Sequence, residues 1–217
     1  MGNGMGNASH DIFWISVDPS LPVATWNREL GFYASAGWTM ASADTEFRRL
    51  YESGEADYRL LVPNEKSSGA LSPFQLTVTA PYQVEYNLEL ARLSVDPRLP
   101  SRLSSTFAFG TKQDAVKAAR DARRPAHEVY AFKLERDELT RVHRANFDVV
   151  SLMRCATRIA SLGAETLDAI GRHYWTGGAE LTLDLPSESG FGRRERTTGV
   201  TWEYLIEGGL RVLERRH

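Results

Sequence analysis

Residues 100–120 read PSRLSSTFAFGTKQDAVKAAR, and this stretch predicts a strand that leads directly into a helix. Hydroxyl and apolar side chains alternate from Ser104 to Phe109, which is typical of a half-buried strand. Thr111 then suits a helix N-cap, with Asp114 three residues later in position to return the contact. The helix that follows is rich in alanine on one side, so it can pack closely on a sheet.

The rest of the chain predicts further strands and helices in alternation. By apolar periodicity, strands are expected at Asp11–Val17, Phe74–Thr79, His127–Leu134, Trp202–Ile206 and Leu210–Leu213. Helices are expected at Thr25–Ala36, Phe47–Gly54, Tyr82–Leu93, Asn146–Leu162 and Ala164–Trp175. Polar and Gly-rich composition predicts loops at Asn64–Ser72 and Leu185–Thr201, and Gly208-Gly209 predicts a hairpin between the last two strands. The pattern indicates an α+β fold with a mixed sheet.

Length and composition bound the possibilities further. A chain of 217 residues with 42% hydrophobic residues fits one domain, expected over residues 11–217 after a Gly/Asn-rich disordered leader at 1–10. The net charge of −2 excludes only a strongly basic nucleic-acid binder. The single cysteine, Cys155, allows no internal disulfide and is expected in the core. The five histidines are scattered, so no metal site is expected. There is no signal peptide and no apolar run of the roughly 20 residues that a span needs, so we expect no membrane association and a cytoplasmic location.

The predicted strand also carries a family resemblance. Its sequence Ser-Thr-Phe-Ala-Phe, residues 105–109, followed by a helix that opens with small residues, resembles the second sequence motif of ADP-ribosyltransferases. In that superfamily this strand lies against the nicotinamide of NAD. The longer phrase PSRLSSTFAF resembles in particular a poorly characterised bacterial family of the superfamily. The resemblance implies an ADP-ribosyltransferase-like split, mixed sheet with packed helices.

A second motif lies near the C-terminus, where residues 197–213 read TTGVTWEYLIEGGLRVL. In ADP-ribosyltransferases a loop leads here into a strand that bears a catalytic glutamate, and Glu203 is similar in position. Glu207 is the alternative, but its place beside Gly208-Gly209 predicts a solvated turn residue. Cleavage of the nicotinamide–ribose bond builds positive charge on the sugar, which a fixed carboxylate stabilises. Without the resemblance, Glu203 is simply a solvent-facing strand residue.

The resemblance implies several contacts with NAD. Phe107 or Phe109, which alternation puts on one face, would stack on the nicotinamide, and Arg102 would pair with the diphosphate. Ser105 and Thr106 would bond a ribose hydroxyl or brace Glu203. The remaining expected contacts come from Trp14 and Ser16 on the first strand and from Trp175 before the long loop. Core packing is the alternative for the aromatic residues, and a solvated strand end is the alternative for Arg102.

The sequence departs from the family at two positions. Many members place His or Arg on the first strand, where this chain has Trp14 and Ser16. Arginine-specific members carry Glu or Gln two residues before the catalytic glutamate, where this chain has Thr201, so modification of protein arginine is disfavoured. The neighbouring Arg193, Arg194 and Arg196 would contact phosphates if the acceptor is a nucleic acid.

These observations predict a mono-ADP-ribosyltransferase that cleaves NAD and passes ADP-ribose to a macromolecule, either nucleic acid or protein. A bacterial or phage toxin or defence effector fits this activity, with an antitoxin as its partner. The alternative is an inactive module of the same fold that binds a nucleotide or a partner. A weaker alternative is an NAD-consuming RNA phosphotransferase, which needs basic residues around a 2′-phosphate that the sequence does not supply.

Overall fold

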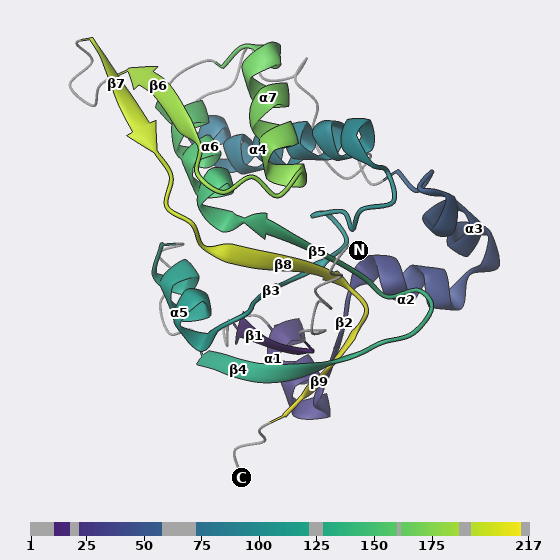
Figure 1. The fold of residues 1–217 in the computed structure, drawn as a ribbon. Coiled ribbons are helices and arrows are strands. Elements are labelled where there is room, and N and C mark those ends of the chain that lie inside the picture. The colour runs from purple at the N-terminus through teal and green to yellow at the C-terminus, as the bar shows by residue number, and fades with distance from the viewer. Residues whose placement is uncertain are drawn as a thin grey trace, which may run out of the picture.

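A seven-stranded sheet joins the two ends of the described chain in the computed structural model (Figure 1). The structure describes residues 11–17, 22–57, 73–121, 128–159, 162–186 and 192–213. The strands of this sheet are β1 (Ile12–Val17), β2 (Phe32–Ala34), β3 (Thr106–Phe109), β4 (Glu128–Glu135), β5 (Arg141–Asn146), β8 (Trp202–Glu207) and β9 (Gly209–Val212). Their order is β2-β9-β4-β1-β3-β8-β5, and each neighbouring pair is antiparallel. The fold is therefore α+β, as predicted. The prediction of a mixed sheet is wrong, because every neighbouring pair of strands in this sheet is antiparallel.

Helices cover the sheet in separate groups. The described helices are α1 (Pro22–Leu30), α2 (Ala36–Ala43), α3 (Thr45–Ser53), α4 (Pro73–Val95), α5 (Lys112–Asp121), α6 (Phe147–Ile159) and α7 (Ala164–Trp175). Helices α4, α6 and α7 gather over the β5–β8 end of the sheet, and α5 lies at the lower left in Figure 1. A two-stranded hairpin, β6 (Thr182–Pro186) with β7 (Arg193–Thr197), projects beyond them. None of the described helices is long and apolar enough to cross a bilayer.

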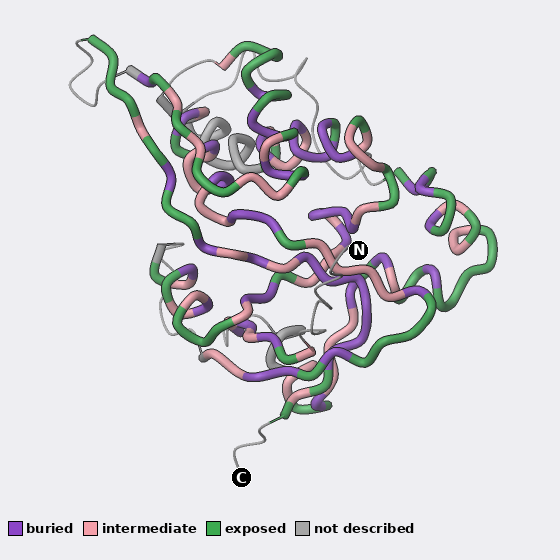
Figure 2. The backbone as a smooth tube through the Cα atoms, in the orientation of Figure 1, coloured by how far each residue is buried: buried purple, intermediate pink, exposed green. Residues whose placement is uncertain are grey.

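The core divides between the two faces of the sheet. Val84 and Leu88 of α4 pack with Met153 of α6, Ile170 of α7 and Leu205 of β8 on the helical face. On the opposite face, a second cluster joins strands β1, β3, β4, β8 and β9. Figure 2 shows β8 buried along most of its length, whereas β7 is largely exposed. The strand that carries Glu203 is thus an interior strand with both faces covered.

Several predicted elements are confirmed. The first strand, β3, the strand at β4, the helix at α3 and the pair α6 and α7 lie where the periodicity places them, within a few residues at their ends. The cap of α5 also forms, because the backbone N–H of Asp114 donates to Thr111 Oγ1 at 3.1 Å. The Thr111 hydroxyl in turn donates to the Asp114 carboxylate at 2.8 Å.

Other predictions are wrong. The strand expected at Phe74–Thr79 is the first part of α4, a helix of 23 residues. The helix expected at Thr25–Ala36 ends at Leu30, because Gly31 has a φ of 76° and turns the chain into β2. The sequence analysis missed β2 and β5 altogether. Cys155, expected in the core, is exposed on α6.

The prediction of a hairpin between the last two strands is also wrong, because of the topology of the sheet. Strand β8 pairs with β3 and β5, whereas β9 pairs with β2 and β4, so Gly208 bends the chain between two distant places in one sheet. Gly209 is needed at this point, because a Cβ there would lie 2.7 Å from the Phe32 ring. The loop expected at Leu185–Thr201 contains most of the β6–β7 hairpin. The expected leader at 1–10 and loop at 64–72 lie outside the described residues.

Candidate functional site

Both carboxylates proposed from the sequence lie on one face of β8. Glu203, Leu205 and Glu207 alternate with Tyr204 and Ile206, and Leu205 belongs to the helical core. Glu203 and Glu207 therefore point toward the helices, and each is only 1% exposed. Glu203 lies opposite Phe109 across the β3–β8 pair, so the carboxylate and the two phenylalanines of β3 share this face.

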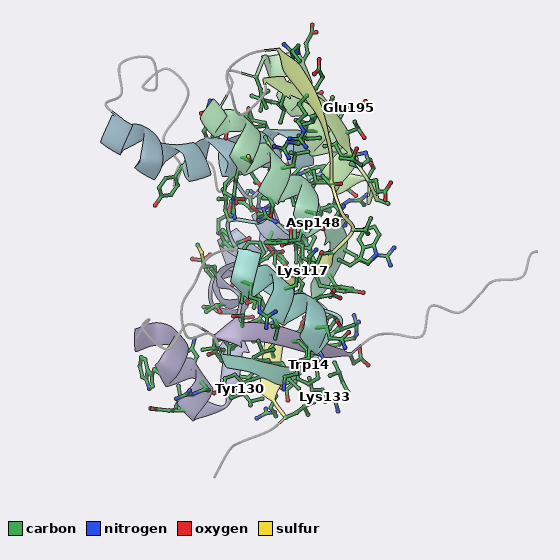
Figure 3. The ribbon with its side chains drawn as sticks, turned by 90° about the vertical axis from the view of Figure 1, so that its left-hand side faces the viewer. Trp14, Lys117, Tyr130, Lys133, Asp148 and Glu195 are labelled. Carbon is green, nitrogen blue, oxygen red and sulfur yellow. The ribbon has the colours of Figure 1, made fainter. Side chains whose placement is uncertain are left out.

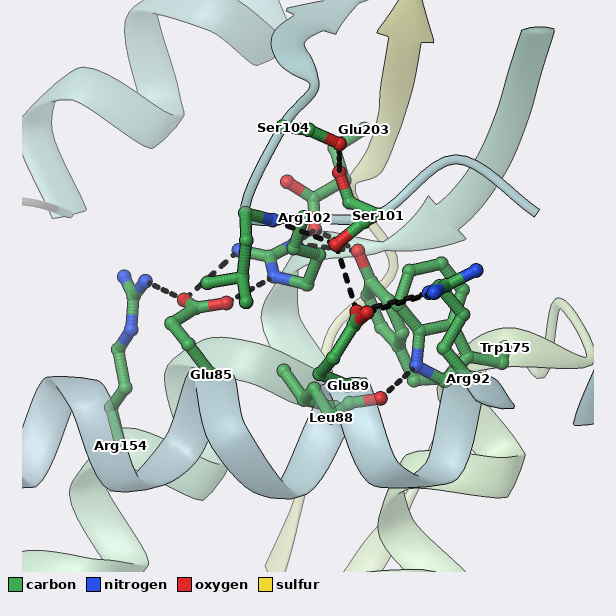
Figure 4. A network of polar contacts seen from close by, with 12 residues as sticks. Glu85, Leu88, Glu89, Arg92, Ser101, Arg102, Ser104, Arg154, Trp175 and Glu203 are labelled. Atoms are coloured by element: carbon green, nitrogen blue, oxygen red, sulfur yellow. Dashed lines mark hydrogen bonds and ion pairs between the residues drawn. The ribbon is translucent and has the colours of Figure 1, made fainter. Parts of the chain in front are cut away.

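Glu203 is held by two donors from different parts of the chain (Figure 4). Arg102 Nη1 donates to Glu203 Oε1 at 2.6 Å, and the Tyr174 hydroxyl donates to the same oxygen at 2.7 Å. Arg102 Nη1 also lies 2.5 Å from the Tyr174 oxygen, which closes a triangle. Glu203 Oε2 accepts no hydrogen bond from the described residues. The carboxylate is thus fixed through one oxygen and keeps the other for a ligand.

The charges around Glu203 continue outward in alternating sign. Arg102 Nε donates to Glu85 at 2.8 Å, and Arg154 Nη2 donates to the other oxygen of Glu85 at 2.7 Å. Burial opposes the charge of Arg102, but Glu203 and Glu85 outweigh it and hold the pKa of Arg102 well above its ordinary value. Burial likewise opposes the Glu85 carboxylate, yet Arg102 and then Arg154 lower its pKa. Burial raises the pKa of Tyr174 well above its ordinary value, so its hydroxyl stays protonated and donates.

The segment that carries Arg102 is fastened to α4 by a second buried pair. Arg92 donates to both oxygens of Glu89, at 2.9 and 2.8 Å, and both side chains are at most 2% exposed. Glu89 also accepts from the Ser101 hydroxyl at 2.8 Å, and Arg92 donates to the carbonyl of Leu99 at 2.9 Å. These bonds fix the chain immediately before Arg102, so the guanidinium reaches Glu203 from a rigid support.

A cavity of about 390 Å³ opens beside this cluster. Its volume falls in the range of about 300–1,000 Å³ that is typical of small-molecule sites. Its lining combines charged groups, aromatic rings and small alanines of α5. The lining residues that bear on chemistry are Ser16, Glu85, Arg102, Phe107, Phe109, Arg154 and Glu203. The arrangement suits a ligand that has a planar ring joined to a hydroxylated group.

The chain matches no model of a known protein family, and no curated protein matches it. The site must therefore be interpreted from its own geometry.

The structure brings together five of the residues that the sequence analysis singled out. Ser16, Arg102, Phe107, Phe109 and Glu203 all line the cavity, although they come from three strands and a loop. Phe107 is 37% exposed, and the Arg102 guanidinium carbon lies 4.6 Å from its ring centroid. Arg102 itself is 5% exposed, so the alternative of a solvated strand end is wrong.

Four of the residues expected to contact NAD do not line the cavity. Trp175 is 2% exposed in the helical core, where its Nε1 donates to the carbonyl of Leu88 at 2.6 Å. Thr106 lies opposite Ile206 and so faces the other side of β3 from Phe107. Ser105 does not brace Glu203, since its buried hydroxyl has no partner in the described structure. Trp14 packs against the cluster formed by α5 and Phe109.

Glu207 is buried, so its expected place in a solvated turn is wrong. The Ser104 hydroxyl donates to Glu207 Oε1 at 2.5 Å, and the Ser101 N–H donates to the same oxygen at 3.3 Å. Helix α2 covers it so closely that a Cβ on Gly37 would lie 2.8 Å from Glu207 Oε1. Burial raises the pKa of the Glu207 carboxyl. Glu207 does not line the cavity and is a structural residue.

The residues expected to meet an acceptor lie beyond this cavity. Arg193 forms an exposed pair with Asp184 at 2.6 Å within the β6–β7 hairpin. Arg194 and Arg196 occupy the other face of β7, opposite Leu185 and Leu183. Thr201 is buried and bonded to Asp148 at 2.9 Å. None of these side chains reaches the cavity that contains Glu203.

The sequence analysis missed Glu85, Arg154 and the hydroxyl of Tyr174. One signal pointed to the α4 contribution: Glu85, Glu89 and Arg92 are spaced four and three residues apart, which places three charges on one helix face next to the apolar stripe. A charged stripe beside an apolar one indicates buried partners elsewhere in the chain. Among the described residues there is no group of three His, Cys, Asp or Glu side chains that could hold a metal ion.

Proposed function

We propose that this protein is a mono-ADP-ribosyltransferase with an ADP-ribosyltransferase-like fold, which cleaves NAD and transfers ADP-ribose to a macromolecule. The observation that carries the proposal is the position of Glu203. Its carboxylate is fixed through Oε1 by Arg102 and Tyr174, while the side chain borders a cavity whose aromatic wall is Phe107 and Phe109. A toxin or defence effector acting in the cytoplasm fits this activity.

The cavity suits the nicotinamide and its ribose. Nicotinamide is a flat aromatic ring, and stacking on Phe107 or Phe109 would hold it within van der Waals contact. The ribose would then lie over β8, where Glu203 Oε2 accepts a hydrogen bond from a sugar hydroxyl. Ser16 supplies a further hydroxyl on β1, in the region where many ADP-ribosyltransferases carry His or Arg.

The chemistry follows from this placement. The bond between ribose C1′ and the nicotinamide nitrogen breaks, and nicotinamide leaves with the electron pair. Positive charge develops on the ribose, and the preorganised Glu203 carboxylate stabilises it. An O–H or N–H group of the acceptor then bonds to C1′ and releases its proton.

Arg102 takes a different role from the one expected of it. Since Arg102 already pairs with Glu203 and Glu85, it acts as a positioning residue for the catalytic carboxylate rather than as a diphosphate ligand. Arg154 lines the same cavity and its side chain is 36% exposed, so it is the better candidate for the diphosphate. Its guanidinium would pair with phosphate oxygens in the usual forked geometry.

The test is release of nicotinamide from NAD by the purified protein and by two matched variants. We expect Glu203→Gln to lower the rate by about 10²–10³, the usual effect of removing one preorganised electrostatic group. Glu207→Gln is the control, because it removes a buried carboxylate from the same strand face without touching the cavity. Equal rates for the wild type and Glu203→Gln would refute the proposal.

An inactive nucleotide-binding module is the second candidate. The pairing of Glu203 with Arg102 favours this candidate. The guanidinium already compensates the negative charge of Glu203, and catalysis needs that charge to stabilise the ribose. Calorimetric titration with NAD distinguishes the two functions, because a module binds NAD without releasing nicotinamide.

A further inference from the structure

A second cavity of about 490 Å³ is lined by residues of α5 and α6, two helices that also line the first one. Its lining includes Lys117, Asp148 and Cys155, each of which is adjacent in sequence to a residue that lines the first cavity. Helices α5 and α6 therefore form parts of both cavities. An acceptor in the second cavity would approach the Glu203 site along these shared walls.

Asp148 is the carboxylate of the second cavity, and two side chains fix its position. The Thr201 hydroxyl donates to Asp148 Oδ2 at 2.9 Å, and Lys117 Nζ lies 3.1 Å from the same oxygen and also contacts Thr201 (Figure 3). A Cβ at residue 199 would lie 2.7 Å from Asp148 Oδ2, so Gly199 leaves the space that this carboxylate occupies. These bonds hold the Asp148 side chain, which is 13% exposed and so remains reachable.

Asp148 of α6 is bonded to Thr201, which lies two residues before Glu203 in the chain. The Phe147 N–H donates to the Thr201 carbonyl at 2.8 Å, which extends the antiparallel pairing of β5 and β8 by one residue. Thr201 and Glu203 are two residues apart on this extended chain, so their side chains share one face with a spacing of about 7 Å. Thr201 therefore holds a carboxylate from α6 close to the part of the chain that carries Glu203.

The charges around Asp148 decide which acceptor suits the cavity. Arg196 lines it together with Lys117, so two cations flank one carboxylate. Arg194 pairs in register with Leu185, a buried residue of the cavity wall, and so lies on the same face of the hairpin as Arg196. A cationic acceptor such as an arginine side chain would be repelled, whereas phosphates would be attracted. The apolar floor at Leu152 and Leu185 suits a nucleobase.

We propose that the second cavity binds one nucleotide of a single-stranded nucleic acid, and that Asp148 accepts the proton from its attacking N–H or O–H group. The nucleotide forms a bond to ribose C1′ as nicotinamide leaves, and the proton passes from Asp148 to water. Arg194 and Arg196 contact the phosphates on either side. The proposal rests on the transferase function proposed above.

The experiment measures two products from labelled NAD: free nicotinamide and ADP-ribose attached to a mixed-sequence 12-mer of single-stranded DNA, of RNA, or to a mixture of proteins. We expect the wild type to label an oligonucleotide. Asp148→Asn should lower the ratio of transfer to nicotinamide release by about 10²-fold or more, as loss of a general base does. Asp168→Asn, which changes an exposed aspartate paired with Arg172 on α7, is the control and should leave the ratio unchanged.

Arg196→Gln provides a second, independent variant on an exposed hairpin. With two phosphate contacts, the logarithm of the oligonucleotide binding constant should fall against the logarithm of the salt concentration with a slope of about −1.4. Loss of one contact should change this slope to about −0.7. Label on proteins alone, or an unchanged ratio in Asp148→Asn together with an unchanged slope in Arg196→Gln, would overturn the nucleic-acid acceptor. Failure of the wild type to release nicotinamide is a different result, because it removes the transferase function itself.

Discussion

Replacing Arg102 by methionine tests the geometry on which the site depends. The side chains of Arg102 and Glu203 are 3% and 1% exposed, so the substitution leaves Glu203 buried with only the Tyr174 hydroxyl as a partner. Breaking a buried ion pair in this way costs about 3–5 kcal/mol. For a chain of this length, each kcal/mol lowers the melting temperature by about 2–4 °C, so we expect a loss of about 6–20 °C.

The assay is urea denaturation at pH 7, analysed for the free energy of unfolding. The double variant Arg102→Met with Glu203→Gln should recover part of the loss, because it removes the charge that lacks a partner. Arg172→Met is the matched control, since Arg172 and Asp168 form an exposed pair whose loss should cost less than about 1 kcal/mol. A similarly small loss for Arg102→Met would show that solvent reaches Glu203, and the reasoning about a fixed carboxylate would fail.

Two further predictions concern the cavity and the helical core. Phe107→Ala should raise the KM for NAD by about 2- to 13-fold, because one aromatic stacking contact contributes about 0.5–1.5 kcal/mol, and steady-state nicotinamide release measures this. His143 has its pKa lowered from 6.5 to about 4 by burial, so the folded protein should lose stability as the pH falls from 6.5 toward 4. That difference of about 2.5 pH units corresponds to about 3 kcal/mol, and urea denaturation at pH 4.5 and 7 should show His143→Phe to be less sensitive to acid.

The strand and helix at residues 100–120 could be predicted from sequence because every signal there is local. Alternation sets the strand, and Thr111 caps the helix through a bond to a residue three positions away. The same kind of alternation led to a wrong prediction at Phe74–Thr79. These six residues were expected to form a strand but lie in the first part of α4, a helix of 23 residues. Packing of Val84, Leu88 and Ala91 in the helical core outweighs propensities of a few tenths of a kcal/mol per residue.

The candidate site was predictable only in part, for a similar reason. Glu203 and the phenylalanines of β3 follow from short motifs, and both motifs lie on adjacent strands. The pairing of Arg102 with Glu203 joins residues 101 positions apart, which no local pattern reveals. Glu207 was misjudged because Gly208-Gly209 resembles a hairpin turn, whereas the sheet order sends β8 and β9 to different neighbours and buries Glu207 under α2.

The position of β8 has a consequence for synthesis of the chain. This strand is made after both of its neighbours, yet it fills the gap between β3 and β5 and supplies Glu203. A nascent chain that has not yet reached Trp202 therefore lacks the Glu203 carboxylate. It also lacks the strand that joins β3 to β5. The proposed enzyme therefore stays inert until β8 has been made and has paired with its neighbours, which suits a product that is harmful to the cell that makes it.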